Sequence, residues 1–153
     1  MAGEGDLNGM VAMADRDMVP WTEWDFCKCG DPTGADLDPL VIDAHEPPAG
    51  ANLGQLALRT LVEPYPQVIA GTPTQWHFDR STGTFSLDYL TKGPRREFKD
   101  GAITDIAVPQ INYPSGYAVH VQGAAVASAP GAPVLELAQA GRARSVSVTV
   151  EPG

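Results

Sequence analysis

The amino-acid sequence predicts a chain of mixed fold class, in which a helix–strand–helix segment precedes an all-β sandwich. The 153 residues are 43% hydrophobic and 19% charged, which is typical of a globular protein. The hydrophobic period changes from 3.6 to 2 after residue 66. The charge changes in the same region: residues 1–63 hold 12 acidic and 3 basic side chains, whereas residues 64–153 hold 7 of each. These observations predict two structural units, 1–63 and 64–153.

The first unit is expected to contain two helices, with a strand and a long loop between them. Apolar residues at positions 7, 10, 11 and 14 share one helical face, which predicts a helix over 5–16. The aromatic stretch 18–26 is expected to form a strand, and 27–49 a long polar loop. A second helical pattern, with Asn52 as its N-cap, predicts a helix over 50–62, which the following prolines end.

The second unit reads as a series of short strands. Residues 74–78 and 84–90 are expected to form a hairpin, with "DRSTG" as its turn. Strands are further expected in "AITDIAVP", "GYAVHVQ", "AAVAS", "PVLELAQ" and "RSVSVTVEP", which lie between Gly-, Pro- and Asn-containing turns. Seven or so short strands in this length predict a β-sandwich. Its core is expected to include the hairpin side chains Trp76, Phe78, Phe85, Leu87 and Tyr89.

The overall composition excludes several classes of function. The net charge of −9 and the pI of about 4.5 argue against a nucleic-acid partner, which needs a basic surface. No apolar run is long enough for a transmembrane helix, and the N-terminus has no basic region typical of a signal peptide. The sequence contains no P-loop, no G-x-G-x-x-G and no G-x-S-x-G. We therefore predict no cofactor.

Cys27 and Cys29 are separated by one residue. Zinc sites more often have two to four residues between cysteines and need four ligands, and the three histidines are scattered, so no metal site is predicted. A disulfide within Cys-Lys-Cys is expected to be strained. Free thiols, or pairing with a segment elsewhere, are therefore favoured over a bond between the two.

The stretch "WTEWDF" groups aromatic and acidic side chains. Glu23 and Asp25 would face the same side of a strand, but their spacing is too close for carboxylates on opposite sides of a scissile bond. Trp21 and Trp24 would face opposite sides, so one could pack in a core while the other stacks on a sugar. For each tryptophan alone, core packing is the ordinary interpretation.

Long segments resemble endoglycoceramidase-type glycoside hydrolases of family 5. "AMADRDMVPWTEWDFCKCGDPT" is similar to the last helix–strand–loop of that family's barrel. "RTLVEPYPQVIAGTPTQWHFDRSTGTFSLDYL" and "TDIAVPQINYPSGYAVHV" are similar to its C-terminal β-sandwich domain. The resemblance implies that residues 1–63 form the end of a (β/α)₈ barrel and residues 64–153 form the sandwich.

The resemblance also implies a function and a set of substrate-binding residues. Such enzymes hydrolyse O-glycosyl bonds of glycolipids with retention of configuration, so a glycolipid or oligosaccharide is the expected partner of the intact enzyme. Trp21, Glu23 and Trp24 would lie at or near the sugar-binding end of the last strand. The family is exported, which implies an extracellular location.

No catalytic residue is assigned in these 153 residues. The family's acid/base glutamate follows the fourth barrel strand, and its nucleophile ends the seventh, which places both before Met1. Glu4 lies nearest but lacks the flanking "EFG" pattern. Whether the chain is an enzyme by itself is therefore left open. The alternative is a non-catalytic β-sandwich module that binds carbohydrate or lipid, or that braces the barrel.

Overall fold

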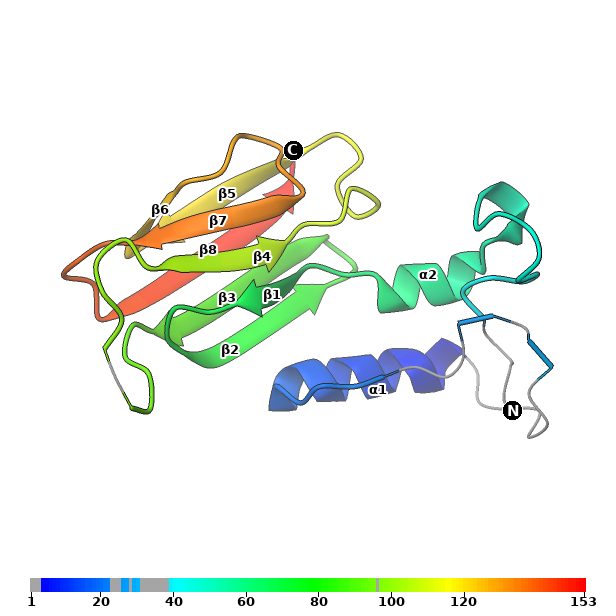
Figure 1. Cartoon of the computed structure of the whole chain (residues 1–153), viewed down its shortest axis with the longest axis horizontal. Coiled ribbons are helices and arrows are strands. Elements are labelled where there is room, and N and C mark those ends of the chain that lie inside the picture. The colour runs from blue at the N-terminus through cyan, green and yellow to red at the C-terminus, as the bar shows by residue number, and fades with distance from the viewer. Residues whose placement is uncertain (1–3, 23–25, 28, 31–38, 96) are drawn as a thin grey trace. The chain divides into compact units, whose positions relative to one another are not determined.

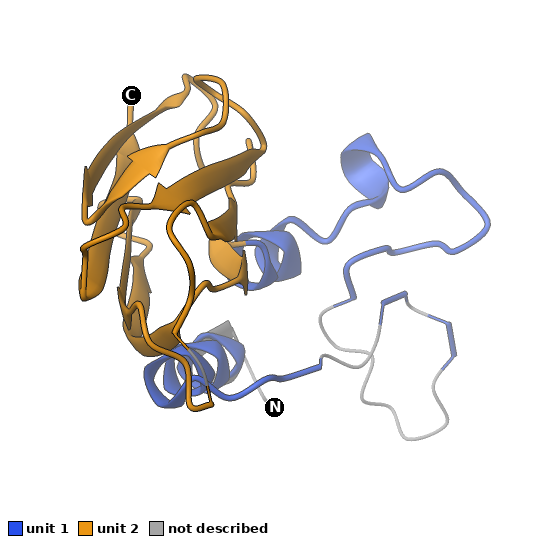
Figure 2. Ribbon diagram, turned by 60° about the vertical axis from the view of Figure 1, so that its left-hand side comes forward, with its two compact units in different colours: residues 1–62 blue, residues 63–153 orange. Residues whose placement is uncertain are grey.

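The computed structural model describes residues 4–22, 26–27, 29–30, 39–95 and 97–153. The chain divides into two compact units, Met1–Val62 and Glu63–Gly153 (Figure 2). The first contains the helices α1 (Glu4–Asp17) and α2 (Gln55–Leu61) and the 3₁₀ helix η1 (Gly50–Asn52). The second contains two β-sheets and no helix among its described residues (Figure 1). The predicted fold class is confirmed: a short helical segment precedes a two-sheet β domain.

Helix α1 confirms the first predicted helix and ends in a Schellman motif. The backbone N–H of Val19 donates to the carbonyl of Ala14 at 2.9 Å, and that of Met18 donates to Asp15 at 3.1 Å. Met18 takes the left-handed conformation that this motif requires, with φ of 51°. Glycine is the usual residue in this left-handed conformation, but methionine occupies it here. The helix ends at Asp17.

The strand predicted over residues 18–26 is wrong for the residues that the structure describes there. Met18 lies in the turn that ends α1, and residues 19–22 are in no strand. Phe26 is also in no strand, and the first β-bridge among the described residues after α1 is at Cys27. A strand needs a neighbour to satisfy its backbone N–H and C=O groups, so an aromatic pattern alone does not create one.

The second predicted helix is present but shorter, because α2 begins after η1 and a break. Gly54 is the N-cap of α2, so the prediction that Asn52 caps this helix is wrong. A Cβ at Gly54 would lie 1.9 Å from the carbonyl oxygen of Pro39, which leaves room only for glycine. Helix α2 lies beside α1, and the hydroxyl of Thr60 donates to Asn8 Oδ1 at 3.0 Å.

Two four-stranded antiparallel sheets make up the second unit (Figure 1). One has the order β1-β4-β7-β6 and the other the order β2-β3-β8-β5. The strands are β1 (Tyr65–Val68), β2 (Thr72–Asp79), β3 (Thr84–Leu90), β4 (Ile103–Ala107), β5 (Tyr117–Gln122), β6 (Ala124–Val126), β7 (Val134–Gln139) and β8 (Ser145–Pro152). The β2–β3 pair is the predicted hairpin, and the five further predicted strands are β4 to β8.

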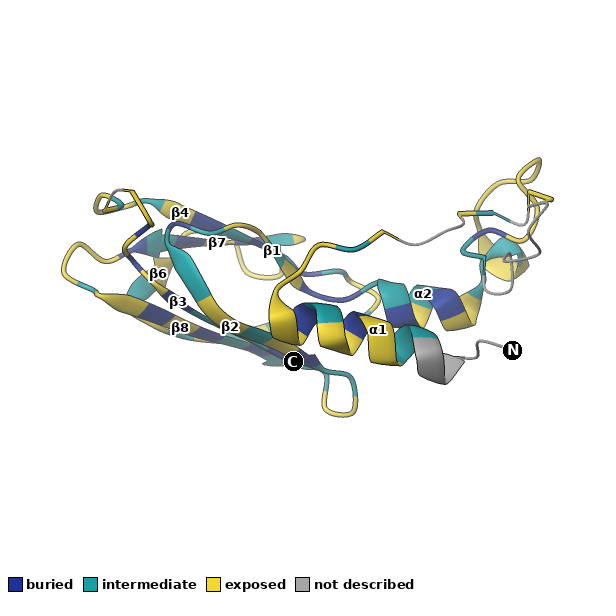
Figure 3. Cartoon of the chain, turned by 90° about the horizontal axis from the view of Figure 1, so that it is seen from below, coloured by how far each residue is buried: buried dark blue, intermediate teal, exposed yellow. Residues whose placement is uncertain are grey.

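The core lies between the two sheets, where burial alternates along the strands (Figure 3). In β8, Val146, Val148 and Val150 are each at most 1% exposed, while Ser145 and Ser147 face solvent. The predicted hairpin core is confirmed, with Trp76 partly buried against it. The buried residues of this core are Phe78, Phe85, Leu87, Tyr89, Ile106, Val108, Tyr113, Leu135, Leu137, Val146, Val148 and Val150.

Strand β1 was not predicted from the sequence. It carries Pro66 in a four-residue edge strand that pairs with β4. Proline is tolerated there because an edge strand has a side that needs no donor. The two prolines at positions 64 and 66 indicated only that the preceding helix ends.

Candidate functional site

The predicted sugar-binding residues lie on the segment that follows α1. Trp21 is partly buried and lies outside regular secondary structure. Glu23 and Trp24 lie outside the described residues, so the grouping of these three side chains stays a prediction. The candidate site is therefore built from the loop that follows Trp21, whose described residues are 26–27, 29–30 and 39–54.

Cys27 and Cys29 form a disulfide with each other, so the prediction of free thiols is wrong. Their Cα atoms are 5.2 Å apart, inside the ordinary range for a disulfide. The backbone closes around this link, because the N–H of Cys29 donates to the carbonyl of Cys27 at 2.7 Å. One intervening residue is therefore enough when the chain turns at the pair.

Val41 ties three parts of the loop together. It forms a parallel bridge with Cys27 and an antiparallel bridge with Leu53. The N–H of Val41 donates to the carbonyl of Phe26 at 2.9 Å. The Val41 side chain is only 3% exposed. The predicted long polar loop is thus anchored by one buried apolar residue.

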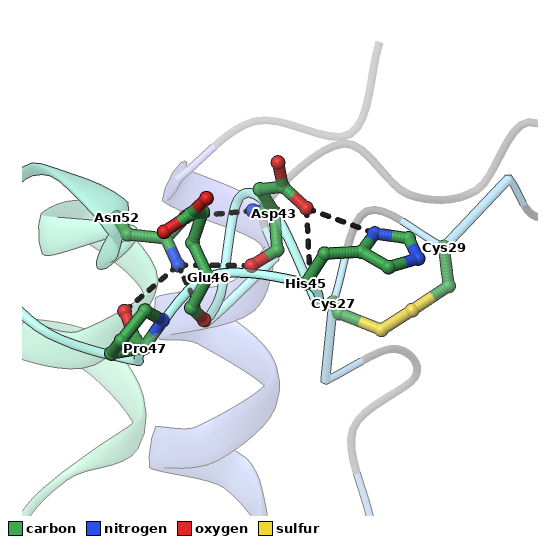
Figure 4. A network of polar contacts seen from close by, with 7 residues as sticks. All are labelled: Cys27, Cys29, Asp43, His45, Glu46, Pro47 and Asn52. Atoms are coloured by element: carbon green, nitrogen blue, oxygen red, sulfur yellow. Dashed lines mark hydrogen bonds and ion pairs between the residues drawn. A yellow bond between two sulfur atoms is a disulfide. The ribbon is translucent and has the colours of Figure 1, made fainter.

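Asn52 organises the turn that follows Val41 (Figure 4). Its Oδ1 accepts the backbone N–H of Asp43 at 2.7 Å. Its Nδ2 lies 2.9 Å, 3.2 Å and 3.0 Å from the carbonyl oxygens of Asp43, Glu46 and Pro47. These backbone groups have no helix or sheet to join, so the amide of Asn52 takes the place of secondary structure.

Asp43 and His45 form an exposed pair on this turn (Figure 4). Asp43 Oδ1 accepts the backbone N–H of His45 at 2.9 Å and lies 3.2 Å from His45 Nδ1. The side chain of His45 is 96% exposed and that of Asp43 is 55% exposed. The N–H of His45, and then its ring, hold the pKa of Asp43 below its usual value.

The surface of the loop combines these polar groups with exposed apolar ones. Phe26 is 64% exposed and Ile42 is 47% exposed. An ionised carboxylate such as that of Asp43 accepts hydrogen bonds from hydroxyl groups, and an imidazole donates or accepts them. A lowered pKa also means that Asp43 holds no proton to give at neutral pH, so it does not act as a general acid.

This pairing was missed in the sequence, although one signal pointed to it. Aspartate often accepts the backbone N–H two residues later in an Asx-turn, and "DAHEPP" at 43–48 fits that chemistry. Asn52, whose amide binds the backbone of Asp43, lies nine residues further along the chain. No local sequence rule connects these two residues.

Three aromatic rings of the hairpin in the second unit are buried in the core of the sandwich. Phe78, Phe85 and Tyr89 point into the core and are at most 6% exposed. The hydroxyl of Tyr89 is engaged there as well, since Thr104 Oγ1 donates to it at 3.0 Å. A sugar-stacking role for this hairpin therefore lacks an exposed ring face in these three residues.

In the part of the chain that the structure describes, no three His, Cys, Asp or Glu side chains gather as metal ligands would. Within the same ranges, no helix is both long and apolar enough to cross a membrane.

Comparison with known proteins places the chain in a family. Residues 64–150 match the glycoside hydrolase family 5 C-terminal domain. Endoglycoceramidase I of Rhodococcus hoagii is 34% identical over 136 residues, covering 87% of this chain and 23% of that protein. Endoglycoceramidase II from Rhodococcus sp. aligns with a TM-score of 0.63 at 23% identity, over 100% of this chain and 30% of that chain. Sterylglucosidase 1 of Cryptococcus neoformans aligns with a TM-score of 0.54 at 16% identity, over 63% of this chain and 14% of that one.

The chain thus spans about a quarter of the length of the curated relative that it matches. The resemblance to endoglycoceramidases in the sequence is confirmed, and it extends beyond the sandwich, because 87% of the chain exceeds the share of residues in the second unit. The match over residues 64–150 covers more than half of the chain. This protein belongs to glycoside hydrolase family 5.

Proposed function

We propose that these residues form the end of the barrel and the C-terminal sandwich of a retaining glycosidase of the endoglycoceramidase type. The intact enzyme would hydrolyse the O-glycosyl bond between an oligosaccharide and a lipid. The observation that carries the proposal is the 34% identity to an endoglycoceramidase over a length that includes most of both units. A relative that shared only an accessory domain would align with the sandwich alone.

In this proposal, the loop that begins at Trp21 borders the sugar site. Loops that follow barrel strands build the active sites of (β/α)₈ enzymes. The indole of Trp21 would stack on a sugar ring, while Glu23 and Trp24 remain proposed contacts to the same sugar. The disulfide, the Val41 bridges and the Asn52 amide fix the backbone of the loop, and this limits the entropy lost when substrate binds.

The proposal assigns the chemistry to residues outside this chain. Retaining glycosidases use two carboxyl groups about 5 Å apart, one as nucleophile and one as acid/base. We expect the 153 residues alone to give no turnover of a fluorogenic lactoside or glycolipid. Stoichiometric turnover that disappears in Glu4→Gln or Glu23→Gln would contradict this expectation.

A chimera tests the positive part of the proposal. The region of Rhodococcus hoagii endoglycoceramidase I that aligns with this chain would be replaced by these 153 residues. We expect the chimera to release oligosaccharide from a glycolipid, and Trp21→Ala to lower kcat/KM by roughly tenfold or more because the stacking face is lost. Trp21→Phe, which keeps an aromatic face, is the matched control. A folded chimera without glycolipid hydrolysis would contradict the proposal.

The alternative function is a non-catalytic module, and the burial of the hairpin rings weakens its sugar-binding version. Its sugar-binding version relied on the aromatic hairpin, and three of that hairpin's rings are buried in the core. Support for a bracing role comes from the sandwich having a core of its own. A hydrolytically active chimera whose rate is unchanged by Trp21→Ala would favour bracing.

An exported parent enzyme is part of the proposal. The Cys27–Cys29 disulfide supports it, because disulfides persist in oxidising compartments and are rare in the cytosol. Alkylation of the protein directly on cell lysis, followed by mass spectrometry, is expected to label neither cysteine. Full labelling of both would contradict an oxidising location.

A further inference from the structure

Five described basic residues of the second unit lie at one end of the sandwich. Lys92, Arg95 and Lys99 belong to the connection between β3 and β4, and Arg142 and Arg144 belong to the connection between β7 and β8 (Figure 1). All five side chains are exposed. Among the described residues, none of the five has a carboxylate within 4.0 Å.

Two carboxylates share this end of the sandwich. Glu97 and Asp100 lie in the same β3–β4 connection, so the five described cations outnumber the two carboxylates there. Asp100 lies against the backbone of Gly141, where its Cγ would be 2.7 Å from an added Cβ. The excess of positive charge stands out in a chain whose net charge is −9.

Hydrogen bonds hold the two connections together. The N–H of Thr91 donates to the carbonyl of Arg144 at 3.1 Å, and its hydroxyl donates to Ala143 at 2.7 Å. The N–H of Gly101 donates to the carbonyl of Gln139 at 2.9 Å. Lys92 and Glu97 are joined by an antiparallel bridge. The cations therefore sit on a braced surface rather than on two independent loops.

A hollow of about 620 Å³ lies between the two connections, and its lining includes Lys92, Arg142, Arg144 and Gln139. Gln139 is only 5% exposed, and its Oε1 has no hydrogen-bond partner among the described residues. A buried amide oxygen without a partner is costly unless something donates to it. This oxygen is itself buried, so the exposed cations are the groups that a ligand in the hollow contacts.

Apolar side chains lie beside the cations. Leu90, at the end of β3, is 47% exposed, and Ile103, at the start of β4, is 40% exposed. Phe98 is partly exposed and contributes to the lining of the hollow. Cations next to exposed apolar groups are typical of protein surfaces that lie on lipid head groups.

We propose that this end of the sandwich, the basic end, docks on an anionic phospholipid surface. Lys92, Arg95, Lys99, Arg142 and Arg144 face the head-group phosphates, and the hollow admits one phosphate-bearing head group.

The choice of a lipid surface over a soluble anion rests in part on the proposed function, because a glycolipid hydrolase works where its substrate is displayed. The test does not depend on hydrolysis. Cosedimentation of the 153-residue chain would be measured with vesicles of phosphatidylcholine alone and of phosphatidylcholine with phosphatidylglycerol, both free of glycolipid. Failure of the hydrolase proposal would leave this result unaffected.

Binding is expected to the mixed vesicles and not to phosphatidylcholine alone, and to disappear at about 0.5 M salt, where charges are screened over a few ångströms. Arg142→Gln with Arg144→Gln should weaken binding roughly 10- to 30-fold, since each cation near an anionic surface contributes about a factor of five. Lys92→Gln with Lys99→Gln is the second variant, in case the first does not fold. Both are checked by near-ultraviolet circular dichroism.

The matched control is Arg16→Gln with Arg59→Gln, which removes the same charge from the first unit and is expected to bind as the parent chain does. Equal binding to the two vesicle types would overturn the proposal, as would equal loss in the control. Displacement from the vesicles by millimolar glycerol 3-phosphate would also overturn it, because a soluble phosphate would then suffice.

Discussion

The side-chain amide of Asn52 holds both backbone groups of Asp43. Its Oδ1 accepts the Asp43 N–H at 2.7 Å and its Nδ2 donates to the Asp43 carbonyl at 2.9 Å. Two residues nine positions apart therefore pair as neighbouring strands do, although one of them contributes a side chain.

Replacement of Asn52 by alanine is expected to release the turn at 43–47. Several hydrogen bonds are lost and the freed backbone groups turn to water, so the local free energy of unfolding should fall by about 2 kcal/mol. Hydrogen exchange of the Asp43 amide would report this as faster exchange. Gln55→Ala removes an exposed amide from the neighbouring helix and serves as the control. Unchanged exchange in Asn52→Ala would show that the amide is not what holds the turn.

Acidification is expected to loosen the same turn. The folded pKa of Asp43 is lowered, so its contribution to stability is present above the unfolded pKa near 3.9 and is lost as the pH falls through the folded value. Titration of the Asp43 carboxyl by NMR should show a low pKa that His45→Ala raises only in part, because the backbone N–H of residue 45 remains. A complete return to the ordinary value would assign the whole effect to the ring.

Tyr113 is expected to resist ionisation. Burial raises its pKa to about 12, and its hydroxyl is buried without a hydrogen-bond partner among the described residues. Its contribution to stability is therefore constant below pH 10 and is lost as the pH rises from about 10 to about 12.

Tyr113→Phe should reduce that alkaline loss and stabilise the fold by about 1 kcal/mol at neutral pH, since the unpaired hydroxyl is removed. Urea unfolding at pH 7 and above pH 10 would measure both effects. A destabilised variant at pH 7 would mean that the hydroxyl has a partner after all.

Thr104 links two buried groups of the sandwich. Its hydroxyl accepts the N–H of Ala70 and donates to Tyr89, both at 3.0 Å, and the residue is fully buried. Thr104→Val keeps the shape but leaves a donor and an acceptor unpaired, so we expect a loss of about 2 kcal/mol. Thr104→Ser keeps the hydroxyl and is the control. Equal loss in both variants would point to the methyl group instead.

The sandwich was predictable because its signals are local and repeated. The alternation of residue types in 145–150 predicts which side chains are buried. The residues of "DRSTG" predict the turn between β2 and β3, where Asp79 Oδ1 accepts the N–H of Ser81 at 2.9 Å and Gly83 has a φ of 70°. Edge strand β1 was not predicted, because four residues that include a proline are too few to show an alternation of apolar and polar side chains.

The candidate site was less predictable, because its contacts join distant residues. The disulfide depends on how the backbone turns at Cys27, and the role of Asn52 depends on where Asp43 lies. Propensity placed Asn52 at a helix cap, which is its commonest use. A local rule gives the preferred chemistry of a residue but not the partner that tertiary structure supplies.

Strand β8 imposes an order on the assembly of its sheet. It lies between β3 and β5, yet it is made after both. While the chain is synthesised, β5 and the β2–β3 hairpin have no common neighbour, and each presents an open edge. Such edges invite pairing with other chains. The central position of Ser145–Pro152 therefore delays closure of the sheet until the last of its strands leaves the ribosome, and shortening that strand would leave two half-sheets prone to aggregation.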